Sequence, residues 1–166
     1  MQKGFTLVEL LVVVAISAVI TMAAGTVIIR IYSESERSSE RLTASQQVQN
    51  AGFWLKGDAS EAQAIMLDDP ETITITELVT LVWYGWDNKI YRAAYTLENS
   101  GGLKKLMRRY SIDGGSPQVT FVADSIVEAS TSAGWDGYIL TLNITAQVGD
   151  QDAARIYQVK PRPLII

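Results

Sequence analysis

Apolar side chains fill the first part of the chain almost without interruption. Residues 5–29 form a run of 25 in which Glu9 is the only ionisable side chain. About 20 helical residues cross a hydrocarbon core of roughly 30 Å, so this run predicts a helix that can span a membrane. Charged and polar residues follow over positions 30–41, which is typical of a solvated helix surface.

A weaker apolar stripe continues the helical pattern after the charged section. Most of its members are three or four residues apart: Val48, Ala51, Leu55, Ala59, Ala62, Ile65 and Met66. This spacing predicts one apolar helix face, which must be buried against another element. Because no proline precedes Pro70, we expect a single helix from about Thr6 to about Met66, ended by Asp68-Asp69-Pro70.

The hydrophobic pattern changes to a period of two after Pro70. Ile73 and Ile75 alternate with threonines, and the clearest further strands are predicted over residues 78–84, 89–97, 103–112, 119–129, 138–148 and 154–159. Short turns separate most of them, and a loop containing Trp135 is predicted over residues 134–137. Short turns join antiparallel neighbours. We therefore predict an α+β fold, in which a long N-terminal helix has a membrane half and a packed half, and the packed half covers an antiparallel β-sheet meander.

Charge and composition narrow the possible chemistry. Lys and Arg total 14 and Asp and Glu total 18, so the formal net charge is 14 − 18 = −4. An acidic chain has no general attraction to nucleic acid, which is not expected as a partner. The chain has no His and no Cys, and no spacing typical of a nucleophile and its base is evident. We expect no enzymatic activity, no catalytic residue, no cofactor and no metal site.

Glu9 is unexpected in a simple membrane segment. A charge inside an apolar segment costs about 2–3 kcal/mol of insertion free energy. One alternative is a secretory signal peptide, because Ala23-Ala24-Gly25 imitates its small-residue cleavage site. Another is a signal anchor in which the charge is incidental. Neither alternative gives the carboxylate a role, whereas a carboxylate in hydrocarbon is tolerated when a cation pairs with it.

The segment KGFTLVELLV, from Lys3 to Val12, resembles the class III signal of type IV pilins and type II secretion pseudopilins. The resemblance implies that a prepilin peptidase cuts after Gly4 and that the new N-terminus at Phe5 is N-methylated. It further implies that Glu9 pairs with the N-terminal amine of a neighbouring subunit. The expected location is the inner (cytoplasmic) membrane, with one transmembrane pass, the C-terminal domain outside the cytoplasm, and assembly into a filament with other minor and major pilins or pseudopilins.

The resemblance and the hydrophobic pattern together predict four parts. Residues 1–4 are the leader peptide, and residues 5–29 are the transmembrane and filament-core helix. Residues 30–67 are the soluble continuation of the helix, and residues 68–166 are the antiparallel β domain.

The C-terminal part resembles the J-type minor pseudopilins and the W-type minor pilins. The segments that carry this resemblance are LVWYGWDNKIYRAAYTLENSGGLKKLMRRY, QVTFVADSIVEA, GYILTLNITAQV and RIYQVKPRP. The resemblance implies a minor subunit that helps to initiate or cap assembly of a type II secretion pseudopilus or a type IV pilus. The alternative is a minor pilin that acts as an adhesin or a DNA-binding receptor at the filament tip.

Three further groups of residues have ordinary structural explanations. Four cations share one predicted strand: Lys104, Lys105, Arg108 and Arg109. Alternation divides them between both faces, so an edge strand protected by charge is favoured over a DNA-binding surface. Asp150 and Asp152 lack the other ligands of a calcium loop, and a turn is favoured there. The aromatic residues of the strands are interpreted as core or cross-strand pairs rather than a partner surface.

Overall fold

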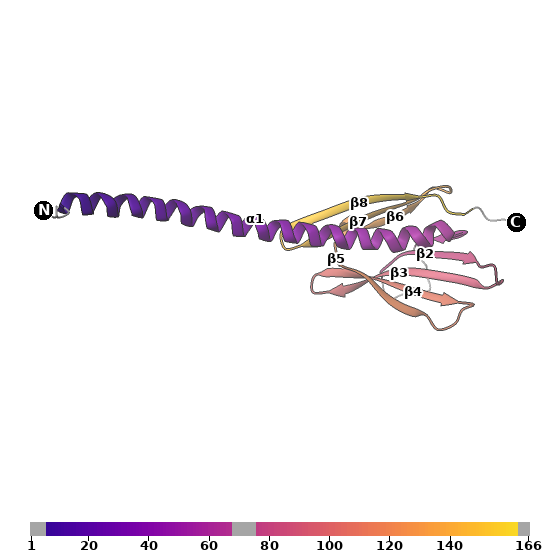
Figure 1. The fold of residues 1–166 in the computed structure, drawn as a ribbon. Helices are drawn as coiled ribbons and strands as arrows, with labels where there is room; N and C mark the ends of the chain where they lie inside the picture. The colour runs from indigo at the N-terminus through magenta and orange to yellow at the C-terminus, as the bar shows by residue number, and fades with distance from the viewer. Residues whose placement is uncertain (1–5, 68–75, 163–166) are drawn as a thin grey trace. The chain divides into compact units, whose positions relative to one another are not determined.

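The computed structural model describes residues 6–67 and 76–162. The chain divides into two compact units, residues 1–39 and residues 40–166. Helix α1, Leu7–Glu61, contributes residues to both units (Figure 1). The strand predicted around Ile73 and Ile75 lies outside the described residues.

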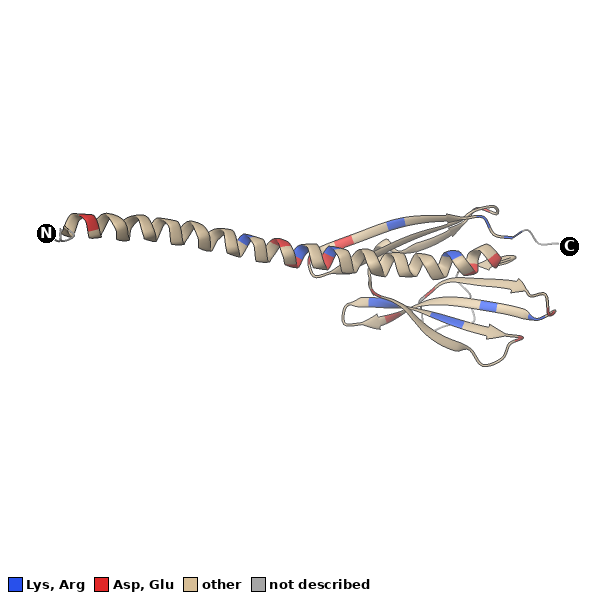
Figure 2. Ribbon diagram, in the orientation of Figure 1, with Lys and Arg blue, Asp and Glu red and all other residues tan. Residues whose placement is uncertain are grey.

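Within the first unit, the apolar side chains of α1 are exposed. No residue in its most apolar 18-residue window is buried, and by length and composition the helix can cross a membrane. Figure 2 shows one acidic position near the start of α1, followed by an uncharged stretch. In the sequence this stretch lies between Glu9 and Arg30.

Helix α1 ends at Glu61, before the end that the sequence predicts near residue 66. The next residues join the sheet instead. The backbone N–H of Gln63 donates to the carbonyl of Val82 at 2.9 Å. Residues Ala64–Met66 then form the short strand β1, which is antiparallel to β2, Thr76–Tyr84. The helix therefore ends where the following residues pair with the edge of β2. The hydrophobic periodicity of the helix carries no information about that edge, so the sequence did not predict this end.

Over its described residues, 40–67 and 76–162, the second unit contains an antiparallel sheet of eight strands. Its other members are β3 (Ile90–Ser100), β4 (Leu103–Ile112), β5 (Gln118–Ile126), β6 (Ser132–Trp135), β7 (Leu140–Val148) and β8 (Gln151–Val159), with a short 3-10 helix, Glu128–Ser130, before β6. Strands β1 to β5 are consecutive neighbours, and β6, β7 and β8 form a second meander. The predicted α+β class, a long helix packed on an antiparallel sheet, is confirmed. The simple meander is interrupted once, because β5 pairs with β7 and not with β6.

The junction between the two meanders depends on polar side chains of α1. Ser125, near the end of β5, has φ of 60°, and the β4–β5 register is irregular beside it. Here the Asn50 amide donates to the carbonyl of Val122 at 2.5 Å, and the side-chain oxygen of Gln47 accepts the backbone N–H of Asp124 at 2.9 Å. The Val122 carbonyl and the Asp124 N–H, which lie at the irregular part of the β4–β5 ladder, are thus hydrogen-bonded to side chains of α1. Buried backbone polar groups need such hydrogen-bond partners.

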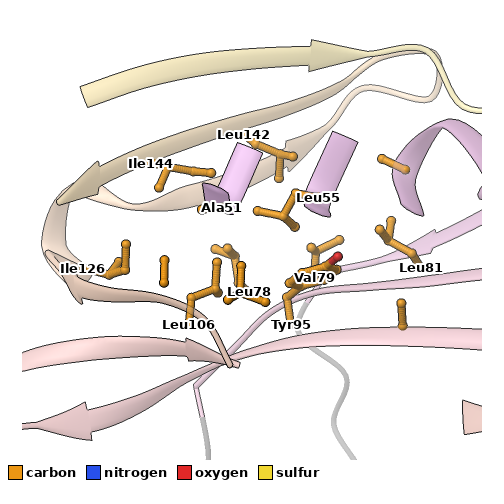
Figure 3. Packing of buried hydrophobic residues seen from close by; sticks show 14 of the residues in the cluster. Ala51, Leu55, Leu78, Val79, Leu81, Tyr95, Leu106, Ile126, Leu142 and Ile144 are labelled. Atoms are coloured by element: carbon orange, nitrogen blue, oxygen red, sulfur yellow. The ribbon is translucent and has the colours of Figure 1, made fainter. Parts of the chain in front are cut away.

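The core lies on both sides of the second half of α1. Figure 3 shows Ala51 and Leu55 between Leu142 and Ile144 on one side and a cluster from β2, β3 and β4 on the other. The first five members of the predicted apolar stripe, from Val48 to Ala62, are completely buried. The last two are on β1, where Ile65 is half-buried and Met66 is exposed.

Strand β6 was not expected, because the sequence predicts a loop over residues 134–137. Trp135 instead pairs with Leu140 at the end of the β6–β7 ladder. The turn between the strands is held by Asp136, whose Oδ1 atom accepts the backbone N–H groups of Tyr138 and Ile139 at 2.8 and 2.7 Å. These hydrogen bonds lower the pKa of Asp136.

Candidate assembly site in the N-terminal helix

Thr6 and Glu9 bind each other across the first turn of α1. The Thr6 hydroxyl oxygen accepts the backbone N–H of Glu9 at 3.3 Å. The Oε2 atom of Glu9 accepts the backbone N–H of Thr6 at 3.2 Å and its hydroxyl at 3.1 Å. A Thr followed three residues later by a Glu forms a capping box, which pairs backbone N–H groups that the helix leaves without partners. The carboxylate also lies at the positive end of the helix dipole.

Glu9 lies among exposed apolar side chains. Leu7, Val8 and Leu10 on the same turn are 63–80% exposed, and the groups of the capping box are exposed as well. The predicted processing residues Gly4 and Phe5 lie outside the described residues. The helix therefore combines an apolar surface, which favours lipid or another apolar helix, with one carboxylate that needs a cation in such surroundings.

The comparison with protein families gives one result for this segment. Residues 1–25 match the model of the prokaryotic N-terminal methylation motif. The chain carries the N-terminal methylation motif of pilin-like proteins. The match includes Glu9 and most of the apolar run that follows it. Neither curated proteins nor solved structures gave a match.

The methylation motif implies a pilin or pseudopilin subunit. The long N-terminal helix packed on an antiparallel sheet is a pilin-like fold. Subunits with this motif are structural rather than enzymatic. The motif also implies processing by prepilin peptidase and assembly with pilins, and together with the apolar helix it indicates a single-pass subunit anchored in the inner membrane.

A second polar cluster fixes α1 on the sheet. We call Asp58, Tyr95 and Arg108 the helix–sheet network. Arg108 of β4 binds Asp58 of α1 with two hydrogen bonds, Nε to Oδ2 at 2.6 Å and Nη2 to Oδ1 at 2.8 Å. The hydroxyl of Tyr95 on β3 donates to the same Oδ2 atom at 2.5 Å. The Arg108 guanidinium also lies over the rings of Trp54 and Tyr110, with 5.1 and 4.5 Å to their centroids.

Burial and charge determine the protonation of this network. Burial lowers the pKa of Arg108, but the hydrogen bonds and charge of Asp58 outweigh burial, so the pKa is raised overall. Burial, followed by the negative charge of Asp58, raises the pKa of Tyr95 above its ordinary value of 10.0. At neutral pH Arg108 is therefore a cation and Tyr95 a neutral donor, which is the state that binds a carboxylate.

Sequence reasoning missed the helix–sheet network although a signal for it was present. Asp58 directly precedes Ala59 and follows Leu55 by three residues, so it lies at the border of the predicted apolar face. A carboxylate at that position needs a cation on the covering sheet. Alternation had already placed Arg108 and Arg109 on opposite faces of their strand, and one of them had to face the helix.

The expectation that residues 103–112 form an edge strand was wrong. Strand β4 lies between β3 and β5. Its inward cation, Arg108, binds Asp58, while Arg109 binds Glu98 at 3.1 Å and Lys104 binds Glu128 at 3.1 Å. Paired cations on an interior strand do not form the basic platform that nucleic-acid binding needs.

The two acidic residues considered for calcium lie at the β7–β8 hairpin. Gly149 has φ of 55° and Asp150 follows it in the turn, while Asp152 belongs to β8 and pairs with Gln147. Within residues 6–67 and 76–162, no group of three Asp or Glu side chains is arranged to hold a metal ion.

Proposed function

We propose that this protein is a minor pilin or pseudopilin that helps to initiate or cap a type II secretion pseudopilus or a type IV pilus. The observation that carries the proposal is Glu9, an exposed carboxylate in an exposed apolar helix that lies inside the matched methylation motif. The resemblance of the β domain to J-type and W-type minor subunits supports the minor role. The β domain lies outside the cytoplasm, and residues 5–29 cross the inner membrane before assembly.

Processing creates the cation that Glu9 requires. Prepilin peptidase removes residues 1–4 by cutting after Gly4, and Phe5 becomes an N-methylated terminal amine. That amine keeps its positive charge, because methylation adds a carbon without removing the basic nitrogen. In the assembled filament the ammonium group of one subunit's Phe5 pairs with the Glu9 carboxylate of its neighbour.

The capping box is compatible with this pairing. A carboxylate offers about four acceptor positions, and Thr6 uses one oxygen of Glu9. A neighbouring ammonium group therefore has acceptor sites available without breaking the helix cap. Apolar helices slide past one another at little cost in free energy. The main effect of one ion pair in the apolar filament core is therefore to fix the axial register of neighbouring helices, and its net contribution to filament stability is smaller.

The DNA-receptor alternative receives no support from the strand that suggested it. Lys104, Arg108 and Arg109 all pair with acidic side chains, and β4 is an interior strand. The net charge of −4 also disfavours binding to a phosphate backbone.

Mass spectrometry of protein extracted from membranes tests the processing step. In cells with the peptidase, the expected chain begins at Phe5 and carries one added methyl group. A Gly4→Leu variant is the control, because a bulky residue before the cut blocks close approach of the backbone to a protease. It should keep Met1 and lack the methyl group. A wild-type chain that still begins at Met1 in those cells contradicts the proposal.

A further inference from the structure

Trp86 is almost wholly exposed at the tip of the β2–β3 hairpin. Its side chain is 99% exposed, the largest value among the described large hydrophobic residues. The turn that carries it is well ordered by hydrogen bonds: the Gly85 N–H donates to the carbonyl of Lys89 at 2.9 Å, and the Asn88 N–H donates to Gly85 at 3.2 Å. A large ring presented on a fixed turn loses little conformational entropy when a ligand covers it.

A surface cleft of about 290 Å³ lies beside this ring. The residues that line it include the aromatic residues Trp83, Trp86 and Tyr91 and the charged residues Glu61, Asp87 and Arg162. Trp83 and Tyr91 are stacked, with ring centroids 5.7 Å apart and planes inclined by 10°. The cleft therefore offers flat apolar faces and planar hydrogen-bonding groups in the same small volume.

The charges around the cleft are balanced. Arg162 binds Glu61 at 2.5 Å, and Lys89 lies 3.5 Å from Asp87. The Tyr91 hydroxyl also donates to Asp87 at 3.0 Å. Because each acidic group already has a cation beside it, the cleft has no excess charge to attract a basic or an acidic ligand.

Glycine at position 85 is needed to keep these groups in place. A Cβ at Gly85 would overlap the ring of Tyr91 and approach the carboxylate of Asp87 to 2.6 Å. The absence of a side chain there lets the ring and the carboxylate approach the turn together. The Tyr91 ring and the Asp87 carboxylate are thus in place before any ligand arrives.

We infer that this cleft binds a neutral saccharide, with one pyranose ring stacked on Trp86. The C–H groups on the flat face of a pyranose ring are apolar and cover an indole, while its hydroxyl groups both donate and accept hydrogen bonds. Asp87 and Glu61 accept such hydroxyl groups and Arg162 donates to them. A volume of 290 Å³ accommodates a ring of this size but not a helix or a folded partner. The inference does not rest on the proposed assembly role, because none of these residues belongs to the N-terminal helix segment that carries the methylation motif.

The test is protection of Trp86 from acrylamide quenching in the full chain, solubilised in a zwitterionic detergent without a sugar headgroup. The probes are cellobiose, maltose, lactose and N,N′-diacetylchitobiose, and mannitol is the control because this open-chain polyol lacks a rigid ring face. At least one disaccharide should lower the quenching, while mannitol should not. Trp86→Ala should weaken binding of that sugar by at least about tenfold, measured by titration calorimetry because this variant lacks the quenched ring. Tyr138→Ala, which removes another exposed aromatic residue, should bind as the wild type does.

Three results would overturn the inference: no protection by any of the four disaccharides, equal protection by mannitol, or sugar binding that Trp86→Ala leaves unchanged. Absence of sugar binding would say nothing about cleavage after Gly4. Equally, a chain that is not cleaved can still be tested for sugar binding, so the two hypotheses can be rejected independently.

Discussion

Removal of the Asp58 carboxylate should destabilise the β domain strongly. The side chains of Asp58 and Arg108 are each only 12% exposed, and Asp58 also accepts the Tyr95 hydroxyl. Asp58→Ala leaves a buried guanidinium without its counter-charge and a buried hydroxyl without its acceptor. Breaking a buried pair on one side costs about 3–5 kcal/mol. We expect the free energy of unfolding of residues 40–166 to fall by that amount.

Urea unfolding followed by circular dichroism measures this change, and three further variants identify its cause: Arg108→Met, the double variant Asp58→Ala/Arg108→Met, and Glu98→Ala. In Asp58→Ala/Arg108→Met both charges are absent, so the double variant should recover about 2 kcal/mol relative to the sum of the single changes. Glu98→Ala breaks a more exposed pair, with side chains 33% and 37% exposed, and should cost about 0–1 kcal/mol. An Asp58→Ala variant no less stable than Glu98→Ala refutes the reasoning.

Two other predictions concern packing and pH. In Gly52→Ala the new Cβ overlaps the ring of Tyr157, so we expect about 1–3 kcal/mol of destabilisation in urea unfolding. In Gly57→Ala the new Cβ meets no atom within 4 Å, so this variant should be more stable than the wild type by up to about 1 kcal/mol. Equal effects of the two variants would contradict the packing account. Because the pKa of Tyr95 is raised by folding, the unfolded chain loses this proton above pH 10 while the folded chain keeps it. The contribution of Tyr95 to the free energy of unfolding is therefore complete below pH 10. Above pH 10 it declines by about 1.4 kcal/mol per pH unit. Urea unfolding between pH 9 and 11 should show this decline in the wild type and a shallower one in Tyr95→Phe, and parallel curves would exclude the assignment.

Local pattern was sufficient to predict the elements that bury a regular face. The apolar stripe from Val48 to Ala62 and the alternation in the later strands are local signals, and the structure contains the corresponding helix face and sheet. The end of the helix was harder to predict, because Ile65 and Met66 fit the helical spacing and also fit the edge strand β1. Only the free edge of β2 decides between these two possibilities.

The sheet junction and the helix–sheet network depend on contacts between residues far apart in sequence. From the sequence alone, Asn50 and Gln47 are expected to be solvated helix positions. In the structure they bind the backbone of β5 where its pairing with β4 becomes irregular. Asp58 and Arg108 are separated by 50 residues, and neither has a local signal that names its partner. For Glu9 the motif identifies a candidate site, and the partner that we propose is a group on another subunit, which a single chain cannot contain.

Incorporation of a Glu9→Gln subunit into the filament is the most direct test of the central claim that the Glu9 charge joins neighbouring subunits. Glutamine at the third helical position still closes the capping box, so this variant removes the charge and keeps the helix cap. Thr6→Ala is the matched control, because it removes the cap hydroxyl and keeps the carboxylate. Mass spectrometry of each variant confirms cleavage after Gly4, and cross-linking to neighbouring subunits measures incorporation. The account predicts normal cleavage in both, about tenfold less incorporation for Glu9→Gln, and nearly wild-type incorporation for Thr6→Ala. Wild-type incorporation of Glu9→Gln, or an equal loss in both variants, would contradict it.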